Sequence, residues 1–417
     1  MRWGIHGWMV LAAVWAGHAG AVGVGGADDP WADVANCAEG QALLQRQPQA
    51  DPQYRDFVQG LCEFEASQPR HDAETIAAIR QWQRDHLVAI GRQVRTLLSS
   101  RDSRDQLAAA LLLPMLQAQQ LQAEPPQVQP QSSFPQASAA FAAARELATA
   151  DRLVAWLEVV TCPGPGVAAD PGCEPEAALA RLQHLDAGNA AVWIQGLGST
   201  SPESQEFEQL LAKAAASSRY EIPFGATGRL LAAVLEQVDA PPLSPDVATA
   251  MGQDFGLGRP ATRRDLDGGV AMAVSSSMAL PAMAVLSRAC PSNGDPTTAQ
   301  RRAQCIAIHT LMSDEPTALS QSMALTKLVL LTVDQPAAAG WRERLREHHW
   351  VWDSASALMR KAVPEDYLDT VWRDGELAAV KSLLQASGTP LTPPAGWLPD
   401  DEHRRSLVTT GREAPNG

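Results

Sequence analysis

The clearest pattern along the chain is a regular spacing of apolar side chains over residues 71–100. Apolar residues recur there every three to five positions, which places them on one face of an α-helix. A stripe of this kind is typical of a helix that packs on a core with one side. The pattern therefore predicts a long amphipathic helix whose buried face contains Ile76, Ile79, Trp82, Leu87, Ile90, Val94 and Leu97.

Helix starts are marked at five places by an Asp or Ser that precedes a proline. The side-chain oxygen accepts a hydrogen bond from a free backbone N–H group, and proline is tolerated at the first helical position. Strand patterns are scarce, because Tyr and Phe are few and no long alternation of apolar and polar positions occurs. The five pairs are Asp29-Pro30, Asp51-Pro52, Ser201-Pro202, Ser244-Pro245 and Asp295-Pro296.

These patterns predict an all-α fold of helical hairpins, with an irregular α-solenoid-like array as one arrangement that they allow. Residues 30–47 and 51–67 form a predicted hairpin, and a helix over residues 103–123 is expected to kink at Pro114. Further helices are predicted at residues 137–161, 174–186, 189–197, 202–218, 224–238, 246–255, 266–288, 296–313, 316–334, 336–361, 365–373 and 375–387.

Two proline-rich stretches divide the predicted helices. Residues 125–136 (PPQVQPQSSFPQ) have the composition of a linker, and residues 240–245 (APPLSP) form a second boundary. Because 417 residues exceed what one core usually serves, several packing units are expected. We predict three helical units and an irregular, proline-rich tail, at residues 22–124, 137–238, 246–387 and 388–417.

The first residues of the chain fit a secretory signal peptide. Arg2 precedes a short apolar run at residues 8–16, and Ala19-Gly20-Ala21 fits the small-residue cleavage pattern. Residues 1–21 are therefore predicted to be removed, although cleavage after Ala27 fits the pattern as well. Such a signal predicts a periplasmic or secreted protein.

The six cysteines fall into three couples that are close in sequence. An even number of cysteines in an exported chain favours disulfide bonds. Fifteen connectivities are open in principle, and pairing of neighbours closes the shortest loops. A metal site is the alternative, but no Cys-x-x-Cys spacing or nearby histidine cluster supports it. The predicted disulfides are Cys37–Cys62, Cys162–Cys173 and Cys290–Cys305.

The stretch over residues 177–220 resembles a tetratricopeptide repeat. Its first part, ALARLQHLDAGNAAVWIQGLG, has an Asp-x-x-Asn turn between helical segments, with Trp193 four residues after Asn189. Ala187 replaces the usual proline of this turn, and no second copy is visible. The resemblance implies a stack of helix pairs, whose usual role is to hold a partner protein in a concave face. The layout as a whole resembles exported bacterial helical proteins.

The chain is acidic, with 33 Lys and Arg against 47 Asp and Glu and a net charge of −14. Binding to nucleic acid requires a basic surface, so no nucleic acid is expected as a partner. Residues 268–287 are uncharged over about the length of a membrane span. Their Ala, Ser and Gly content favours a buried core helix instead, so no membrane span is expected after signal removal.

Catalytic signatures are scarce in the sequence. The chain has no H-E-x-x-H, G-x-S-x-G, Walker or dinucleotide-binding motif, and no cofactor is expected. In REHHWVWD, His349 and Asp353 are four residues apart and share one helix face. Such a pair can ligate a metal or act as a base with its orienting carboxylate. A polar helix face beside core tryptophans explains the pair equally, so no catalytic or metal residue is assigned beyond these two weak candidates.

The sequence thus favours a non-catalytic, exported helical protein that acts by binding another protein. This hypothesis rests on the tetratricopeptide-like stretch and on the scarcity of catalytic motifs. The alternative is an exported hydrolase of cell-envelope material with His349 and Asp353 as its site. Converging acid and base side chains in a surface groove would favour the hydrolase, whereas an apolar concave face would favour the binding protein.

Overall fold

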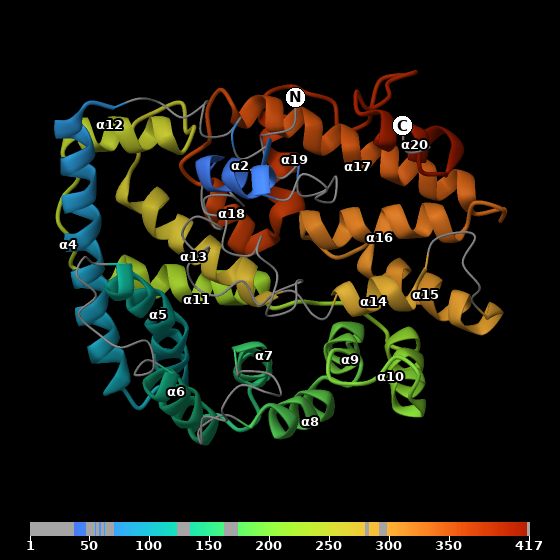
Figure 1. The fold of residues 1–417 in the computed structure, drawn as a ribbon, viewed down its shortest axis with the longest axis horizontal. Helices are drawn as coiled ribbons and strands as arrows, with labels where there is room; N and C mark the ends of the chain where they lie inside the picture. Colours follow the sequence, from blue (N-terminus) through green and yellow to red (C-terminus); the bar gives the residue numbers. More distant parts are fainter. Residues whose placement is uncertain are drawn as a thin grey trace.

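The computed structural model describes residues 37–46, 55, 58–59, 62, 71–122, 134–161, 174–279, 283–291 and 298–414. These residues form eighteen helices and no strand, which confirms the predicted all-α fold (Figure 1). The predicted signal peptide and most of the predicted linker at residues 125–136 lie outside them. Of the predicted N-terminal hairpin, the described part is mainly α2 (Cys37–Arg46).

The first half of the chain forms an arc of successive helices along the left and lower sides of Figure 1. Each helix of the arc packs against the one before it, from α4 through α10. Their bounds are α4 (Ala73–Leu98), α5 (Ser103–Gln122), α6 (Phe134–Leu147), α7 (Arg152–Thr161), α8 (Pro175–Leu185), α9 (Ala190–Leu197) and α10 (Gln205–Ala215).

The second half of the chain packs against this arc along its length. α11 (Phe224–Glu236) contacts α5, α12 (Pro245–Asp254) contacts α4, and α13 (Arg263–Ala279) contacts α7. Farther along the arc, α14 (Met283–Ala289) contacts α9 and α15 (Ala299–Met312) contacts α10. The inner side of the arc is therefore covered by helices of the same chain.

The remaining helices form the upper part of the molecule in Figure 1. α16 packs between α15 and α17, and α19 packs on both α17 and α18. α18 also contacts α11, which connects this part to the interior of the arc. The bounds are α16 (Ala318–Leu331), α17 (Ala338–Met359), α18 (Tyr367–Asp374), α19 (Glu376–Ala386) and α20 (Glu402–Thr410).

The middle of α5 and nearly all of α9 are apolar and buried on all sides. Every residue from Leu107 to Leu113 of α5 is buried, and so is every residue of α9 except the partly buried Gln195. A helix of this kind is stable in water only when other helices surround it. α4, α6 and α11 surround α5, while α8, α10 and α14 surround α9.

The buried apolar residues of the described part form three clusters, and the first of these extends through most of the chain. It contains buried residues from all three predicted helical units, among them Leu107, Leu157 and Leu286. The helices of the three units therefore share a core, and the division into separate units at residues 125–136 and 240–245 stays a prediction.

Most predicted helices are present, but several of their starts are shifted. Ser244 caps α12 as predicted, since its side chain accepts a hydrogen bond from the backbone N–H of Val247. The predicted start at Ser201-Pro202 is wrong, because Ser204 caps α10 and the side chain of Ser201 bonds to Glu203 instead. Of the single helix predicted over residues 266–288, the structure describes α13 up to Ala279 and α14 from Met283, and residues 280–282 lie outside the described part.

The prediction of an irregular tail over residues 388–417 is wrong for its last part, which forms α20. Asp401 caps this helix by accepting a hydrogen bond from the backbone N–H of Arg404. Its only buried side chains are those of Leu407 and Val408. The sequence therefore has no long apolar stripe at this position that would predict a helix. The proline-rich residues before it are irregular but packed on α17.

Two of the predicted disulfides are confirmed, and Cys162–Cys173 lies outside the described residues. The Cα atoms are 4.7 Å apart in Cys37–Cys62 and 5.6 Å apart in Cys290–Cys305, within the usual range.

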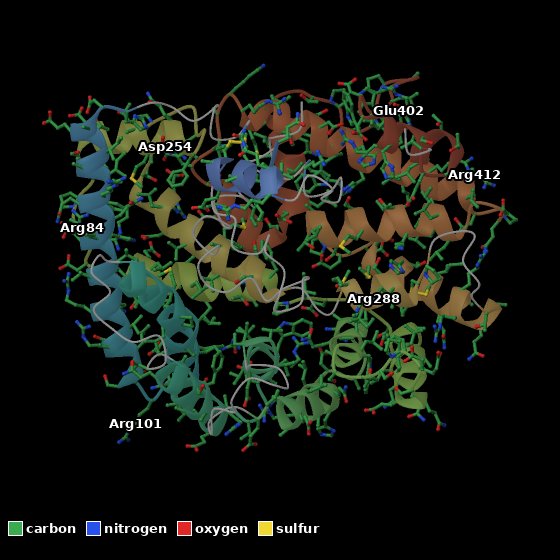
Figure 2. All side chains as sticks on the ribbon, viewed as in Figure 1. Arg84, Arg101, Asp254, Arg288, Glu402 and Arg412 are labelled. Carbon is green, nitrogen blue, oxygen red and sulfur yellow. A yellow bond between two sulfur atoms is a disulfide. The ribbon has the colours of Figure 1, made fainter. Side chains whose placement is uncertain are left out.

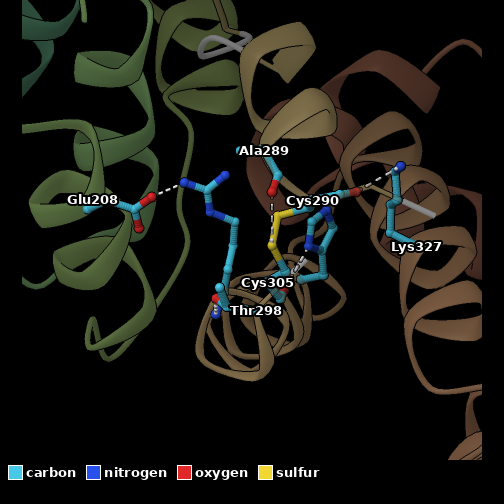
Figure 3. The surroundings of a disulfide bond; sticks show 8 residues. Glu208, Ala289, Cys290, Thr298, Cys305 and Lys327 are labelled. Carbon is cyan, nitrogen blue, oxygen red and sulfur yellow. Dashed lines mark hydrogen bonds and ion pairs between the residues drawn. A yellow bond between two sulfur atoms is a disulfide. The ribbon is translucent and has the colours of Figure 1, made fainter. Parts of the chain in front are cut away.

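The Cys290–Cys305 bond sits among polar groups that join four helices (Figure 3). The Lys327 ammonium of α16 donates a hydrogen bond to the Cys290 carbonyl at 3.1 Å. Beside the bond, an ion pair between Arg301 and Glu208 connects α15 to α10. This region therefore fastens the last helix of the arc to the second half of the chain.

We expect truncation inside α5 to be costly. Leu112→Ala removes a fully buried side chain and should lower the free energy of unfolding by about 2–5 kcal/mol. Val88, which is 58% exposed on α4, provides a matched control, and Val88→Ala should change stability by less than about 0.5 kcal/mol. Urea unfolding of both variants measures this, and equal effects would contradict the burial of α5.

Candidate functional site

The two residues singled out by the sequence lie on α17 but do not form a catalytic pair. The Asp353 carboxylate accepts a hydrogen bond from the Arg404 guanidinium of α20 at 2.9 Å. His349 is 7% exposed, and its Nε2 atom has no hydrogen-bond partner among the described residues. Its neighbour His348 faces α16, where its Nδ1 atom lies 2.9 Å from the Gln321 side-chain oxygen. The described residues thus hold no hydrogen bond between His349 and Asp353.

The electrostatics of these histidines disfavour proton transfer at neutral pH. Burial, together with the nearby His348 and Arg404, lowers the pKa of His349 to about 3. Burial likewise lowers the pKa of His348 to about 4. A general base works best with a pKa near the operating pH. Both rings are therefore neutral in the folded chain and behave as parts of the core.

A second cluster, which the sequence analysis missed, consists of two carboxylates at the start of α16. The Glu315 carboxylate accepts hydrogen bonds from the hydroxyl of Thr317 and, at 2.8 Å, from its backbone N–H. The Glu376 carboxylate, at the start of α19, accepts one from the backbone N–H of Ala318 at 2.7 Å. The first N–H groups of a helix carry a partial positive charge that stabilises such carboxylates.

The surroundings of this pair raise the pKa of each member. Burial, together with the nearby Glu376 carboxylate, raises the pKa of Glu315 to about 7. Burial also raises the pKa of Glu376 above its usual range. Two tyrosines with pKa values raised by burial, Tyr220 and Tyr367, each lie near one of the carboxylates. The cluster therefore holds a proton on Glu315 through part of the neutral range.

The geometry of the two glutamates is that of a helix cap. One oxygen of each is bound to the backbone of α16, so the pair joins the end of α15 and the start of α19 to this helix. Carboxyl groups with raised pKa values also occur in active sites, but purely structural networks of buried polar groups shift the pKa in the same way. No motif in the sequence indicates the pair, because its members are far apart along the chain and meet only in the fold.

Two further groups of buried polar side chains connect separate helices. Glu158 of α7 is fully buried and pairs with Arg145 of α6 at 2.7 Å and with Arg181 of α8. On α4, the His86 ring stacks on Trp82 and lies 3.1 Å from the Asp267 carboxylate of α13. Each group joins separate helices, which identifies it as part of the packing.

The residues of the tetratricopeptide-like stretch form the turn between α8 and α9. Asn189 caps α9, and its side-chain amide also donates to Asp186 at 2.9 Å and to the Glu221 carbonyl at 2.8 Å. The indole N–H of Trp193 donates to the Ala187 carbonyl at 2.8 Å. The predicted Asp-x-x-Asn turn is thus present, and membership of the repeat family stays a prediction.

No known protein family, curated protein or solved structure matches the chain. In the described part, no three His, Cys, Asp or Glu side chains lie close enough together to hold a metal ion. None of the helices described there is both long and apolar enough to cross a membrane.

The Glu315 carboxyl predicts a specific dependence of stability on pH. Its pKa is higher in the folded chain than the ordinary 4.5, so its bound proton stabilises the fold fully below pH 4.5. That contribution is lost as the pH rises through about 7. Glu315→Gln should remove roughly 2–3 kcal/mol of this dependence between pH 5 and pH 8. Urea midpoints measure it, with the exposed Glu236→Gln as control; an unchanged slope would contradict the buried proton.

His349 predicts a dependence of the opposite sign. Its pKa in the folded chain lies below the ordinary 6.5, so its contribution is fully present above pH 6.5 and is lost as the pH falls toward about 3. Between pH 7 and pH 4.5, the free energy of unfolding should therefore fall by roughly 2 kcal/mol less in His349→Leu than in the wild-type chain. Acid unfolding followed by tryptophan fluorescence tests this. The exposed His403→Leu is the control, and equal acid midpoints for the two variants would refute the assignment.

Proposed function

We propose that the chain is a non-catalytic, exported helical protein that acts by binding another protein. The observation that supports this most directly is the arc from α4 to α10, in which each helix packs on its predecessor. Helical-repeat proteins are built in this way, and they commonly present extended surfaces to protein partners. The hydrolase alternative has no comparable support, since the hydrogen bond that His349 and Asp353 would share is not made.

The partner is expected on an outer surface of the molecule. α11, α13 and α14 cover the inner side of the arc, where repeat proteins often hold their ligands. Outside it, the segment from α8 to α10 exposes several carboxylates and few cations, in keeping with the net charge of −14. A partner with a basic surface therefore fits best, because opposite charges speed association and favour the correct pairing.

Crosslinking with mass spectrometry in the native compartment tests the proposal. Carboxyl-reactive reagents suit the chain, which has 47 Asp and Glu. Lysine reagents suit it less, because only four lysines occur and Lys327 is hydrogen-bonded to Cys290. We expect one recurrent partner, linked through exposed carboxylates such as Glu203 and Glu206. Links within the chain alone, together with release of fragments from cell-envelope material by the purified protein, would overturn the proposal in favour of the hydrolase.

A further inference from the structure

The outer face of α4 carries four exposed arginines in one row. Arg80, Arg84, Arg92 and Arg95 follow one another at spacings of four, eight and three residues, so they lie within about a third of the helix circumference. The exposed Val88 fills the gap in the middle of the row. Figure 2 shows Arg84 on the outer side of α4, at the left edge of the molecule. We call these four arginines the arginine row.

The arginine row has no negatively charged partner in the part of the chain that the structure describes. Arg84 bonds to the neutral side chain of Gln81 at 2.7 Å, and Arg92 bonds to the backbone carbonyl of Asp239 at 3.3 Å. Elsewhere in the same structure arginines pair with carboxylates, as Arg145 does at 2.7 Å. The row is therefore an uncompensated positive strip on a chain whose net charge is −14.

The arginines of the row also repel one another. Arg80 and Arg84 are four residues apart, and Arg92 and Arg95 are three apart. Like charges at these spacings face each other on a helix and destabilise it. The chain has 47 Asp and Glu residues, yet none of the described ones neutralises this strip. A negatively charged surface outside the molecule would remove the repulsion.

The shape of the row selects among negatively charged partners. α4 packs on α5 and α12 and forms an edge of the molecule, so its outer face is a convex ridge and not the cleft that a small anion requires (Figure 1). A stable protein interface has an apolar centre of several side chains, whereas Val88 is the only large apolar side chain within the row. A flat surface can meet all four guanidinium groups at once, over about 22 Å of helix.

We propose that the arginine row binds the chain to an anionic lipid surface, with the axis of α4 parallel to that surface. Guanidinium groups match the geometry of headgroup phosphates, and each basic residue at an anionic membrane strengthens the binding by about fivefold. Val88 then lies at the headgroup boundary, where apolar side chains of surface-bound helices insert. The acidic remainder of the chain does not prevent this, because charges more than about 8 Å from the surface are screened at physiological salt.

Co-sedimentation of the full chain with lipid vesicles tests the proposal. The probe is a vesicle of phosphatidylcholine with about one third phosphatidylglycerol, and pure phosphatidylcholine is the reference. We expect binding to the anionic vesicles alone, and its loss at about 0.5 M salt. Arg80→Glu/Arg92→Glu should weaken the binding by about tenfold or more, because two charges of the row are reversed. Equal binding by this variant and wild type, or equal binding to both kinds of vesicle, would overturn the proposal.

Two further variants separate the row from net charge and from misfolding. Arg360→Glu/Lys381→Glu changes the net charge equally at exposed residues outside α4, and it should weaken binding by less than about twofold. Arg80→Gln/Arg92→Gln removes the two charges without reversing them and should give an intermediate loss. Circular dichroism verifies that every chain is folded, and all chains share the same N-terminus. A loss that is equal in the control, or that does not follow this order, would show that the row is not the lipid contact.

The inference goes beyond the proposed function, and the two can fail separately. If wild type binds no vesicles while crosslinking still finds a recurrent partner through Glu203 and Glu206, the lipid contact is wrong and the proposed function stands. If wild type binds no vesicles and Arg80→Glu/Arg92→Glu loses a crosslinked acidic protein in the native compartment, the row is a protein contact and the lipid surface is wrong.

Discussion

The fold depends on the burial of helices that are apolar on every side. Residues Leu107 to Leu113 of α5 and nearly every residue of α9 are buried, so these segments need neighbours all around them. Helices adjacent in sequence provide two of these neighbours, and the second half of the chain provides the third through α11 and α14. The arc is therefore not an independent repeat array, because its stability requires helices that come much later in the chain.

Buried charges follow from the same constraint. Two of the buried carboxylates inside this packing are bound to groups on other helices, because an unpaired buried charge is strongly destabilising. Glu158 is held by two arginines, and Glu376 reaches across to the start of α16. The strongest pKa shifts of the chain thus arise from helix packing. They therefore mark contacts between helices and not a catalytic site.

The sequence predicted the parts of this structure that depend on residues close together along the chain. The stripe from Ile79 to Leu97 and the cap at Ser244 depend on neighbouring residues, and so does the pairing of cysteines that are close along the chain. The prediction was wrong for Ile76, which lies one turn before the core contact begins and is 37% exposed. α20 was missed because its docking needs only two apolar side chains beside a proline-rich segment. The Glu315–Glu376 cluster was beyond reach for another reason: each glutamate alone resembles a surface charge, and only the meeting of α15, α16 and α19 buries them.

The helix that covers the third side of α9 is synthesised late, and this affects how the chain folds during synthesis. Synthesis proceeds from the N-terminus, and domains made this way begin to fold as they emerge. α9 is complete at Leu197, but α14, which covers its remaining side, is complete only at Ala289. At ordinary rates of synthesis, α9 stays partly uncovered for on the order of ten seconds. The nascent chain is thus a natural client for chaperones that shield apolar segments, and the stretch they would protect is the one that later becomes its most deeply buried helix.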